Sequence, residues 1–324
     1  MAAGRRVLVS GMGGDLGSHV AGLLEDEDWV GELAGLDVDP PRRRLQRAAF
    51  HLVRPTDHDR IVDTITAFNP HVVVHIAVWE PHSRANPAAA RQLTDDAVTS
   101  VLGAAAECPA LESLVVRSGI EVYGRARGAP TRPDEDAALD PTCEYGEMLA
   151  GIERTASAIG RRVGVTAGAI RMATLLGPHV PSPLGRLLRM PAVPFSALAD
   201  PPFAVVEDVV VARAFVAAAR RRLGEPVNVV ANGAITALQA ARRGRRVPVP
   251  IFGPEWLLAR AVSGLLGAPI PGHVVETLHR GRLADNGRMQ ELLGFTSPTR
   301  TIDLIGQLYD WPSVVRIPAR RAVA

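Results

Sequence analysis

The sequence predicts an α/β protein with a doubly wound parallel Rossmann sheet and a smaller mixed C-terminal part. Three observations predict this fold. Short runs of β-branched residues alternate with longer helical patterns through the first half of the 324 residues. The first run leads into the glycine-rich segment VLVSGMGGDLG, and Asp37 ends the second. The run His71–Ala77 is apolar along its length, as expected for a strand that is covered on both faces.

The order of the patterns gives the expected elements. We expect strands at Arg6–Ser10, Leu33–Asp37, His51–Val53, His71–Ala77, Leu111–Arg117 and Val163–Ile170. We expect helices between them at Gly14–Leu24, Thr56–Phe68, Ala88–Glu107 and Glu144–Ile159. Beyond residue 172 the alternation stops, because Pro and Gly cluster between Gly177 and Pro202. Later patterns predict helices at Asp208–Leu223, Glu255–Leu266, Asp285–Leu293 and Thr301–Leu308, and a short strand at Val227–Val230. We therefore assign residues 1–172 to an NAD(P)-binding Rossmann domain and 173–324 to a smaller substrate-binding part interleaved with it.

Composition limits the function classes. The 36 basic and 34 acidic residues leave a net charge of +2, so we expect no nucleic-acid partner. All 36 basic residues are arginine, which excludes any mechanism that needs a lysine amine from this chain. The two cysteines, Cys108 and Cys143, have no metal-ligand spacing, and we expect neither a metal site nor a disulfide. We see no signal peptide and no transmembrane stretch, so we expect a cytoplasmic protein without membrane contact.

The glycine segment has the spacing of a phosphate-binding loop. Gly11 allows the tight turn, Gly14 allows close approach of a pyrophosphate, and Gly17 allows close packing of helix on strand. Asp15 and Leu16 open the helix, whose unpaired N–H groups attract phosphate. The alternative is a glycine turn kept only for packing.

Asp37 lies 20 residues after Gly17, where a carboxylate accepts hydrogen bonds from the adenosine ribose and repels a 2′-phosphate. We therefore expect NAD. NADP stays open, because Arg42 and Arg43 follow closely and can bind a phosphate.

Several segments occur together in the order of one family. They are the GxxGxxG loop, VVVHIA at 72–77, VVRSGIEVYG at 115–124, EYGEMLAGIE at 144–153, AVVEDVVVA at 204–212 and NGRMQELLGFTSP at 286–298. The chain resembles the NAD-dependent epimerase/dehydratase branch of the extended short-chain dehydrogenases along nearly its whole length. The resemblance implies a bound nicotinamide dinucleotide, contacted also by Ala77 and Tyr145, and often a nucleotide-sugar substrate. It also implies a possible homodimer through the apolar stretches Ala97–Ala106 and Met148–Ile159.

The family's catalytic set is only partly present. Its members use a Ser or Thr, a Tyr and a Lys, and Tyr145 occupies the tyrosine position. Leu149 stands at the lysine position and Gly119 at the hydroxyl position. If the protein is an enzyme, we expect Tyr145 to be catalytic, with Glu121 and Ser118 as helpers. The alternative is a non-catalytic dinucleotide-binding scaffold or redox-sensing module.

Four further residues are candidates near this site. Arg117 and Arg171 could supply the positive charge that the missing lysine leaves out, although an arginine cannot exchange protons. His75 and His82 flank the end of the fourth expected strand, and either could act as a base. We interpret His75 as a satisfied core residue and His82 as the better functional candidate. Thr94 stands where the family usually has an asparagine.

Overall fold

The computed structural model describes residues 4–82, 85–252 and 269–311. Seven strands form one sheet in the order β3-β2-β1-β4-β5-β6-β10, and every neighbouring pair is parallel. The strands are β1 (Arg5–Ser10), β2 (Val30–Asp37), β3 (Ala49–Leu52), β4 (Val72–His75), β5 (Ser113–Gly119), β6 (Thr166–Met172) and β10 (Pro226–Val229). The strand order reverses between β1 and β4, and α/β sheets bind ligands at the carboxyl ends of the strands beside such a switch point.

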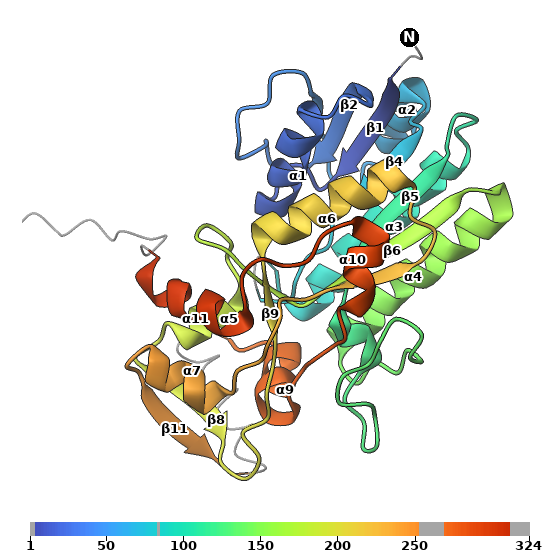
Figure 1. Cartoon of the computed structure of the whole chain (residues 1–324). Coiled ribbons are helices and arrows are strands. Elements are labelled where there is room, and N and C mark those ends of the chain that lie inside the picture. Colours follow the sequence, from blue (N-terminus) through green and yellow to red (C-terminus); the bar gives the residue numbers. More distant parts are fainter. Residues whose placement is uncertain (1–3, 83–84, 253–268, 312–324) are drawn as a thin grey trace, which may run out of the picture.

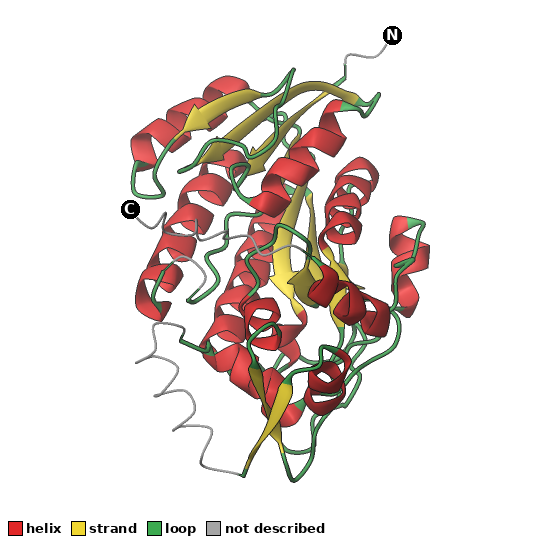
Figure 2. Cartoon of the chain, turned by 90° about the vertical axis from the view of Figure 1, so that its left-hand side faces the viewer, coloured by secondary structure: helices red, strands yellow, loops and turns green. Residues whose placement is uncertain are grey.

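Helices cover both faces of this sheet (Figure 2). On one face, α6 packs against α1 and α10; on the other, α3 packs between α2 and α4 (Figure 1). These helices are α1 (Asp15–Glu25), α2 (His58–Phe68), α3 (Pro87–Ala106), α4 (Glu144–Val163), α6 (Asp208–Arg221) and α10 (Gly287–Leu293). The central strands are accordingly buried on both sides, as at Val7–Val9 of β1 and Val72–Val74 of β4.

The smaller part has its own apolar core, which includes Leu188, Phe203 and Ile305. It contains two short parallel sheets, one of β7 (Thr174–Leu176) with β9 (Val205–Glu207), the other of β8 (Ala192–Ser196) with β11 (Val247–Ile251). Its helices are α5 (Pro183–Leu188), α7 (Ala237–Arg243), α9 (Gly272–Arg280) and α11 (Thr301–Asp310). The two parts are interleaved, because α6 and β10 return from beyond residue 172 to cover and extend the large sheet.

The Pro- and Gly-rich stretch Gly177–Pro202 is more regular than its composition suggests. It contains α5 and β8. The Ser182 side chain accepts a hydrogen bond from the Gly185 N–H, and Pro183 occupies the first turn of α5. Proline at this position starts a helix rather than breaking it, because the missing N–H would have no intrahelical partner there. The expected helix Glu255–Leu266 lies outside the described residues.

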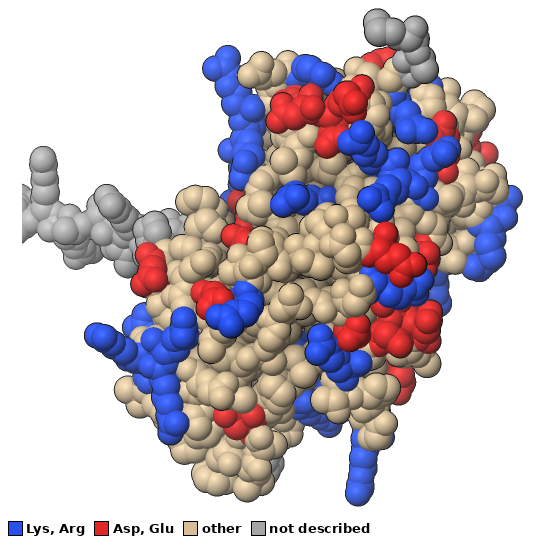
Figure 3. All heavy atoms as spheres, in the orientation of Figure 1, with Lys and Arg blue, Asp and Glu red and all other residues tan. Residues whose placement is uncertain are grey.

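The apolar stretches expected to form a dimer contact are used within the chain. Val98, Val101 and Leu102 of α3 are buried, as are Leu149 and Ile152 of α4. A homodimer stays a prediction. On the face in Figure 3, arginines and carboxylates are intermixed. Among the described residues, none of the helices combines the length and apolar character needed to cross a membrane.

Candidate functional site

The loop between β1 and α1 leaves a helix N-terminus uncovered. Gly14 is the N-cap of α1 and has no side chain to bond the first helical N–H groups. A Cβ atom at Gly17 would lie 1.8 Å from the Gly11 carbonyl oxygen, so only glycine allows α1 to pack this closely. At Gly14, the nearest atom to an added Cβ is the same oxygen, at 3.6 Å. Packing within the chain therefore does not require glycine at 14, and the N–H groups beside it suit an anion.

One hollow at this loop collects the residues assigned to the cofactor. Its lining includes Gly11, Gly14, Asp15, Leu16, Gly17, Asp37 and Ala77. Trp79, Glu80 and Arg117 line it as well, and Val180–Ser182 of the smaller part contribute to its wall. An apolar slot that shares Asp37 and Ala77 adjoins it, lined by side chains that include Val38, Val53 and Ile61. Tyr145 does not line this hollow, but its hydroxyl accepts a hydrogen bond from Arg117, which does.

Asp37, at the end of β2, is fixed by backbone donors. One carboxylate oxygen accepts a hydrogen bond from the Gly13 N–H at 2.7 Å, and the other accepts one from the Val38 N–H at 2.6 Å. The Arg42 guanidinium forms an ion pair with Asp15 at 2.9 Å. The end of β2 therefore presents an oriented carboxylate to the hollow.

Arg117 supplies the cation beside Tyr145. Its Nη2 donates to the Tyr145 hydroxyl at 3.2 Å, and its Nη1 donates to the Val78 carbonyl at 3.3 Å. Its Nε is buried without a hydrogen-bond partner in the described chain. Burial raises the pKa of Tyr145 well above its usual value, and Arg117 only partly opposes this shift. Tyr145 therefore stays a protonated phenol near neutral pH.

The position of the missing hydroxyl residue is filled by a carboxylate. A Cβ atom at Gly119 would lie 2.3 Å from Oε2 of Glu121 and 3.0 Å from Cδ1 of Leu149. Glu121 is itself buried, and its other oxygen lies 4.0 Å from Nε of Arg282, which is 1% exposed. Gly119, Glu121 and Leu149 are thus packed together in place of the hydroxyl and the lysine.

Ser118 lies on the other side of β5 from Arg117, because neighbouring residues of a strand point to opposite faces. Its hydroxyl bonds Glu153 of α4, which also forms an ion pair with Arg171 at 2.8 Å. Arg171 further donates to the Tyr123 hydroxyl at 2.9 Å. The structure does not bring Ser118 or Arg171 to Tyr145, so Arg117 is the arginine at the site.

His75 is buried, but it is not satisfied as we expected. Neither ring nitrogen has a hydrogen-bond partner among the described residues. Burial, and secondarily the charge of Arg117, lowers the pKa of His75 to about 4. His82 lies in the following loop, where its carbonyl accepts a hydrogen bond from Arg186. Thr94 fixes the same loop, since its hydroxyl accepts the Trp79 N–H at 3.0 Å.

His273 and Glu80 are the site residues that sequence reasoning missed. The His273 ring lies 4.6 Å from the Tyr145 ring, centroid to centroid, and its Nε2 is 2.9 Å from Oε1 of Glu80. His273 and Tyr145 line a second hollow together with Thr142 and Glu276. The helical pattern GHVVETLHR was the available signal, but nothing in it distinguishes a site histidine from a core one.

Comparison with known proteins gives the same fold along the chain. The UDP-glucose 4-epimerase of Thermotoga maritima, solved with UDP-glucose, is 18% identical, with a TM-score of 0.72 over 94% of this chain and 98% of that one. MoeE5, solved with UDP-glucose and NAD, is 22% identical with the same TM-score and coverage. The dTDP-glucose 4,6-dehydratase of Bacillus anthracis, solved with NAD, is 14% identical with a TM-score of 0.70, over 95% of this chain and 96% of that one.

Sequence comparison identifies the family. An uncharacterized protein of Mycobacterium tuberculosis is 27% identical over 310 residues, which cover 92% of this chain and 81% of that protein. The model of the NAD dependent epimerase/dehydratase family matches residues 7–230, more than half of the chain. This confirms the resemblance drawn from the sequence: the chain belongs to the NAD-dependent epimerase/dehydratase family.

Proposed function

We propose that the chain binds a nicotinamide dinucleotide, NAD in preference to NADP, and transfers hydride between it and a hydroxyl or carbonyl group of a small substrate. One observation carries the proposal. Seven residues assigned to the cofactor from sequence line one hollow, and that hollow is also lined by Arg117, which bonds the Tyr145 hydroxyl.

The residues present fit a dinucleotide. The space at Gly14 and the bare N-terminus of α1 suit the pyrophosphate. Asp37 would accept hydrogen bonds from the adenosine ribose and would repel a 2′-phosphate. The adjoining apolar slot suits the adenine. These features support NAD over NADP.

The chain's own groups divide the chemistry as follows. When bound, the nicotinamide supplies or accepts the hydride. The protonated phenol of Tyr145 donates a hydrogen bond to the substrate oxygen and gives up its proton as negative charge develops there. Arg117 stabilises the resulting phenolate as a fixed charge. Because a neutral phenol is a donor, this arrangement favours reduction of a carbonyl over oxidation of an alcohol.

Ser118 and Glu121 stay predictions as helpers. Their contacts favour supporting roles: Ser118 bonds the Glu153 carboxylate that pairs with Arg171, and Glu121 lies beside Arg282. A nucleotide sugar is the first substrate class to test, because similar folds have been solved with UDP-glucose.

A second candidate function is a non-catalytic dinucleotide-binding module. Leu149 favours it, since an apolar side chain replaces the group that would exchange protons with Tyr145. This candidate predicts NAD binding and thermal stabilisation without turnover of any carbonyl or sugar nucleotide.

A matched pair of glycine variants tests the cofactor site. Gly14→Val fills the space beside the helix N-terminus at an extended residue with φ of −69°, so the fold should tolerate it. Gly22→Ala lies in the same helix with no atom within 4 Å of an added Cβ. Calorimetric titration should show NAD binding by the wild type and by Gly22→Ala, and at least 100-fold weaker binding by Gly14→Val, about 3 kcal/mol.

The first measurement is mass spectrometry of small molecules released from freshly denatured protein, followed by titration with NAD and NADP. Retained or tightly bound NAD supports the proposal. Failure of the folded wild type to bind either dinucleotide refutes it. NADH oxidation at 340 nm, with a panel of carbonyl compounds and keto-sugar nucleotides, then separates the enzyme from the non-catalytic module.

A further inference from the structure

We propose that His273 and Glu80 form the proton-exchanging pair of this site, returning to Tyr145 the proton that Arg117 cannot supply. The inference rests on the proposed function and deepens it. A tyrosine that gives its proton to a substrate must be reprotonated before the next turnover. The family's lysine is absent, so another group in contact with Tyr145 must exchange that proton.

The other groups around Tyr145 are unsuitable. Arg117 bonds the Tyr145 hydroxyl, but a guanidinium does not exchange protons. Leu149 is apolar and fully buried. Glu121 lies beside Arg282, and burial raises the pKa of Cys143 to about 12.

His273 has the required position. Its imidazole is 4% exposed and lies against the phenol ring at 4.6 Å, with 36° between the ring planes. Nε2 is bonded to Glu80, which leaves Nδ1 as the ring nitrogen that Glu80 does not engage. We infer that Nδ1 exchanges the proton with the Tyr145 hydroxyl, directly or through one water. Glu80 also lines the hollow that contains Arg117, so the pair joins the two hollows.

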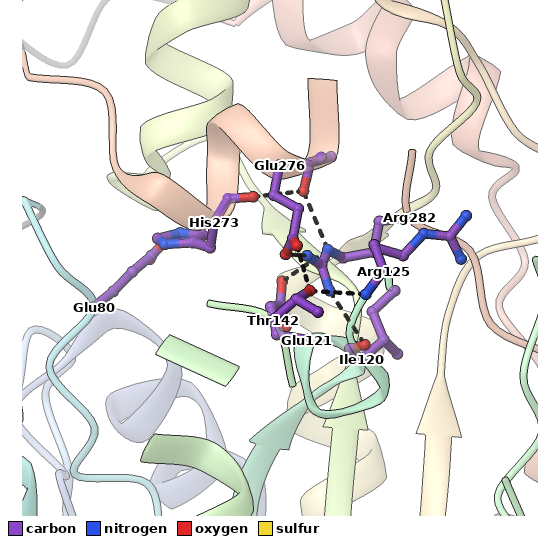
Figure 4. Close-up of polar contacts among 9 residues, drawn as sticks. Glu80, Ile120, Glu121, Arg125, Thr142, His273, Glu276 and Arg282 are labelled. Atoms are coloured by element: carbon purple, nitrogen blue, oxygen red, sulfur yellow. Dashed lines mark hydrogen bonds and ion pairs between the residues drawn. The ribbon is translucent and has the colours of Figure 1, made fainter. Parts of the chain in front are cut away.

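A buried polar network holds α9, and with it His273, in place (Figure 4). Glu276 of α9 forms an ion pair with Arg282, which also donates to the Ile120 carbonyl at 3.5 Å. The Thr277 hydroxyl accepts from Arg282 and donates to the His273 carbonyl at 2.9 Å. Because these contacts tie α9 to the end of β5, His273 is a fixed partner of Tyr145.

The proton steps balance as follows. In carbonyl reduction, Tyr145 gives its O–H proton to the substrate oxygen, and the electron pair of that bond stays on the phenolate. The protonated imidazole of His273 then gives a proton to the phenolate and becomes neutral. Solvent then returns a proton to His273, whose Nε2 lies 2.9 Å from the Glu80 carboxylate. The charged groups that act on Tyr145 are the carboxylates of Glu80 and Glu121 and the guanidinium of Arg117. Glu276 of α9 is paired with Arg282.

The test compares His273→Gln with His279→Gln, which removes a histidine from the same helix outside the two hollows. The assay is NADH oxidation with the carbonyl substrate found in the panel above. His273→Gln should lower kcat 100-fold or more, while NAD affinity stays within about threefold of wild type. His279→Gln should leave kcat unchanged. Added imidazole should restore part of the activity of His273→Ala, which a purely structural role does not predict.

A Glu80→Gln variant gives a second readout. It removes the carboxylate charge that faces Nε2 of His273, so kcat should fall while NAD affinity stays within about threefold of wild type.

The outcomes separate this inference from the proposed function. Turnover that is insensitive to His273→Gln, or to Glu80→Gln, overturns the inference alone. NAD binding without turnover of any substrate in the panel overturns it together with the catalytic part of the proposed function. Absence of NAD binding overturns both entirely.

Discussion

Replacing His75 should make the protein more resistant to acid. The imidazole is fully buried at the end of β4, and neither nitrogen has a partner within the described residues. Burial lowers its pKa from 6.5 to about 4. Below pH 6.5 the unfolded chain therefore binds a proton that the folded chain binds only near pH 4, and the free energy of unfolding falls as pH falls.

The two pKa values give the size of the effect. Between pH 8 and pH 5, the linkage relation gives a loss of about 2 kcal/mol from this one group. In His75→Met the loss is absent, because the replacement has a similar volume and no titrating atom. At pH 8 the variant should be at least as stable as the wild type, since two unpaired buried polar atoms are removed.

Urea unfolding at pH 8 and pH 5, followed by circular dichroism, measures the difference. The wild type should lose about 2 kcal/mol more than His75→Met over this range. His51→Met, at a half-buried position of β3, is the control for removing a histidine. Equal losses in wild type and His75→Met would refute the reasoning, because His75 would then be solvated or hydrogen-bonded in the folded protein.

Three further variants test the altered site. Gly119→Ser should lower the free energy of unfolding by about 1–3 kcal/mol, because its Cβ overlaps the Glu121 carboxylate. In urea unfolding, the double variant with Glu121→Ala should lose less stability than the sum of the losses in the two single variants. Additive losses would contradict the overlap. Leu149→Lys should lower the melting temperature, since it places a cation at a fully buried apolar position. An unchanged melting temperature would mean that the new amine is solvated or paired. Asp37→Ser should weaken NAD binding about tenfold and lower the ratio of NAD to NADP affinity, both measured by fluorescence titration. An unchanged ratio would show that Asp37 does not select the cofactor.

Local patterns predicted well the large sheet and the unit of strand, glycine loop and helix with which it begins. The strand before Gly11, the helix after Gly14 and the position of Asp37 each depend on residues close in sequence. Glycine spacing and the periodicity of apolar residues determine these features, and both can be read from a single sequence. The family resemblance then correctly placed the later segments, although not the contacts that replace its missing residues.

The contacts around Tyr145 were harder to predict because they join distant segments. Glu80 and His273 are separated by 193 positions, and no local pattern marks either one. Likewise, no local pattern indicates that the Glu121 carboxylate occupies the space beside Gly119, because this depends on side-chain packing. Arg117 and Arg171 were both candidates from sequence. The structure distinguishes them, because Arg171 is paired with the Glu153 carboxylate whereas Arg117 donates to the Tyr145 hydroxyl.

The return of the chain to its first sheet has a consequence for how the protein folds. A fragment ending at residue 172 would lack both α6, which covers β4, β5 and β6, and the edge strand β10. The apolar face that α6 covers and the edge of β6 that β10 pairs would be exposed, and both would promote aggregation. We therefore expect that the Rossmann half does not fold as an independent unit.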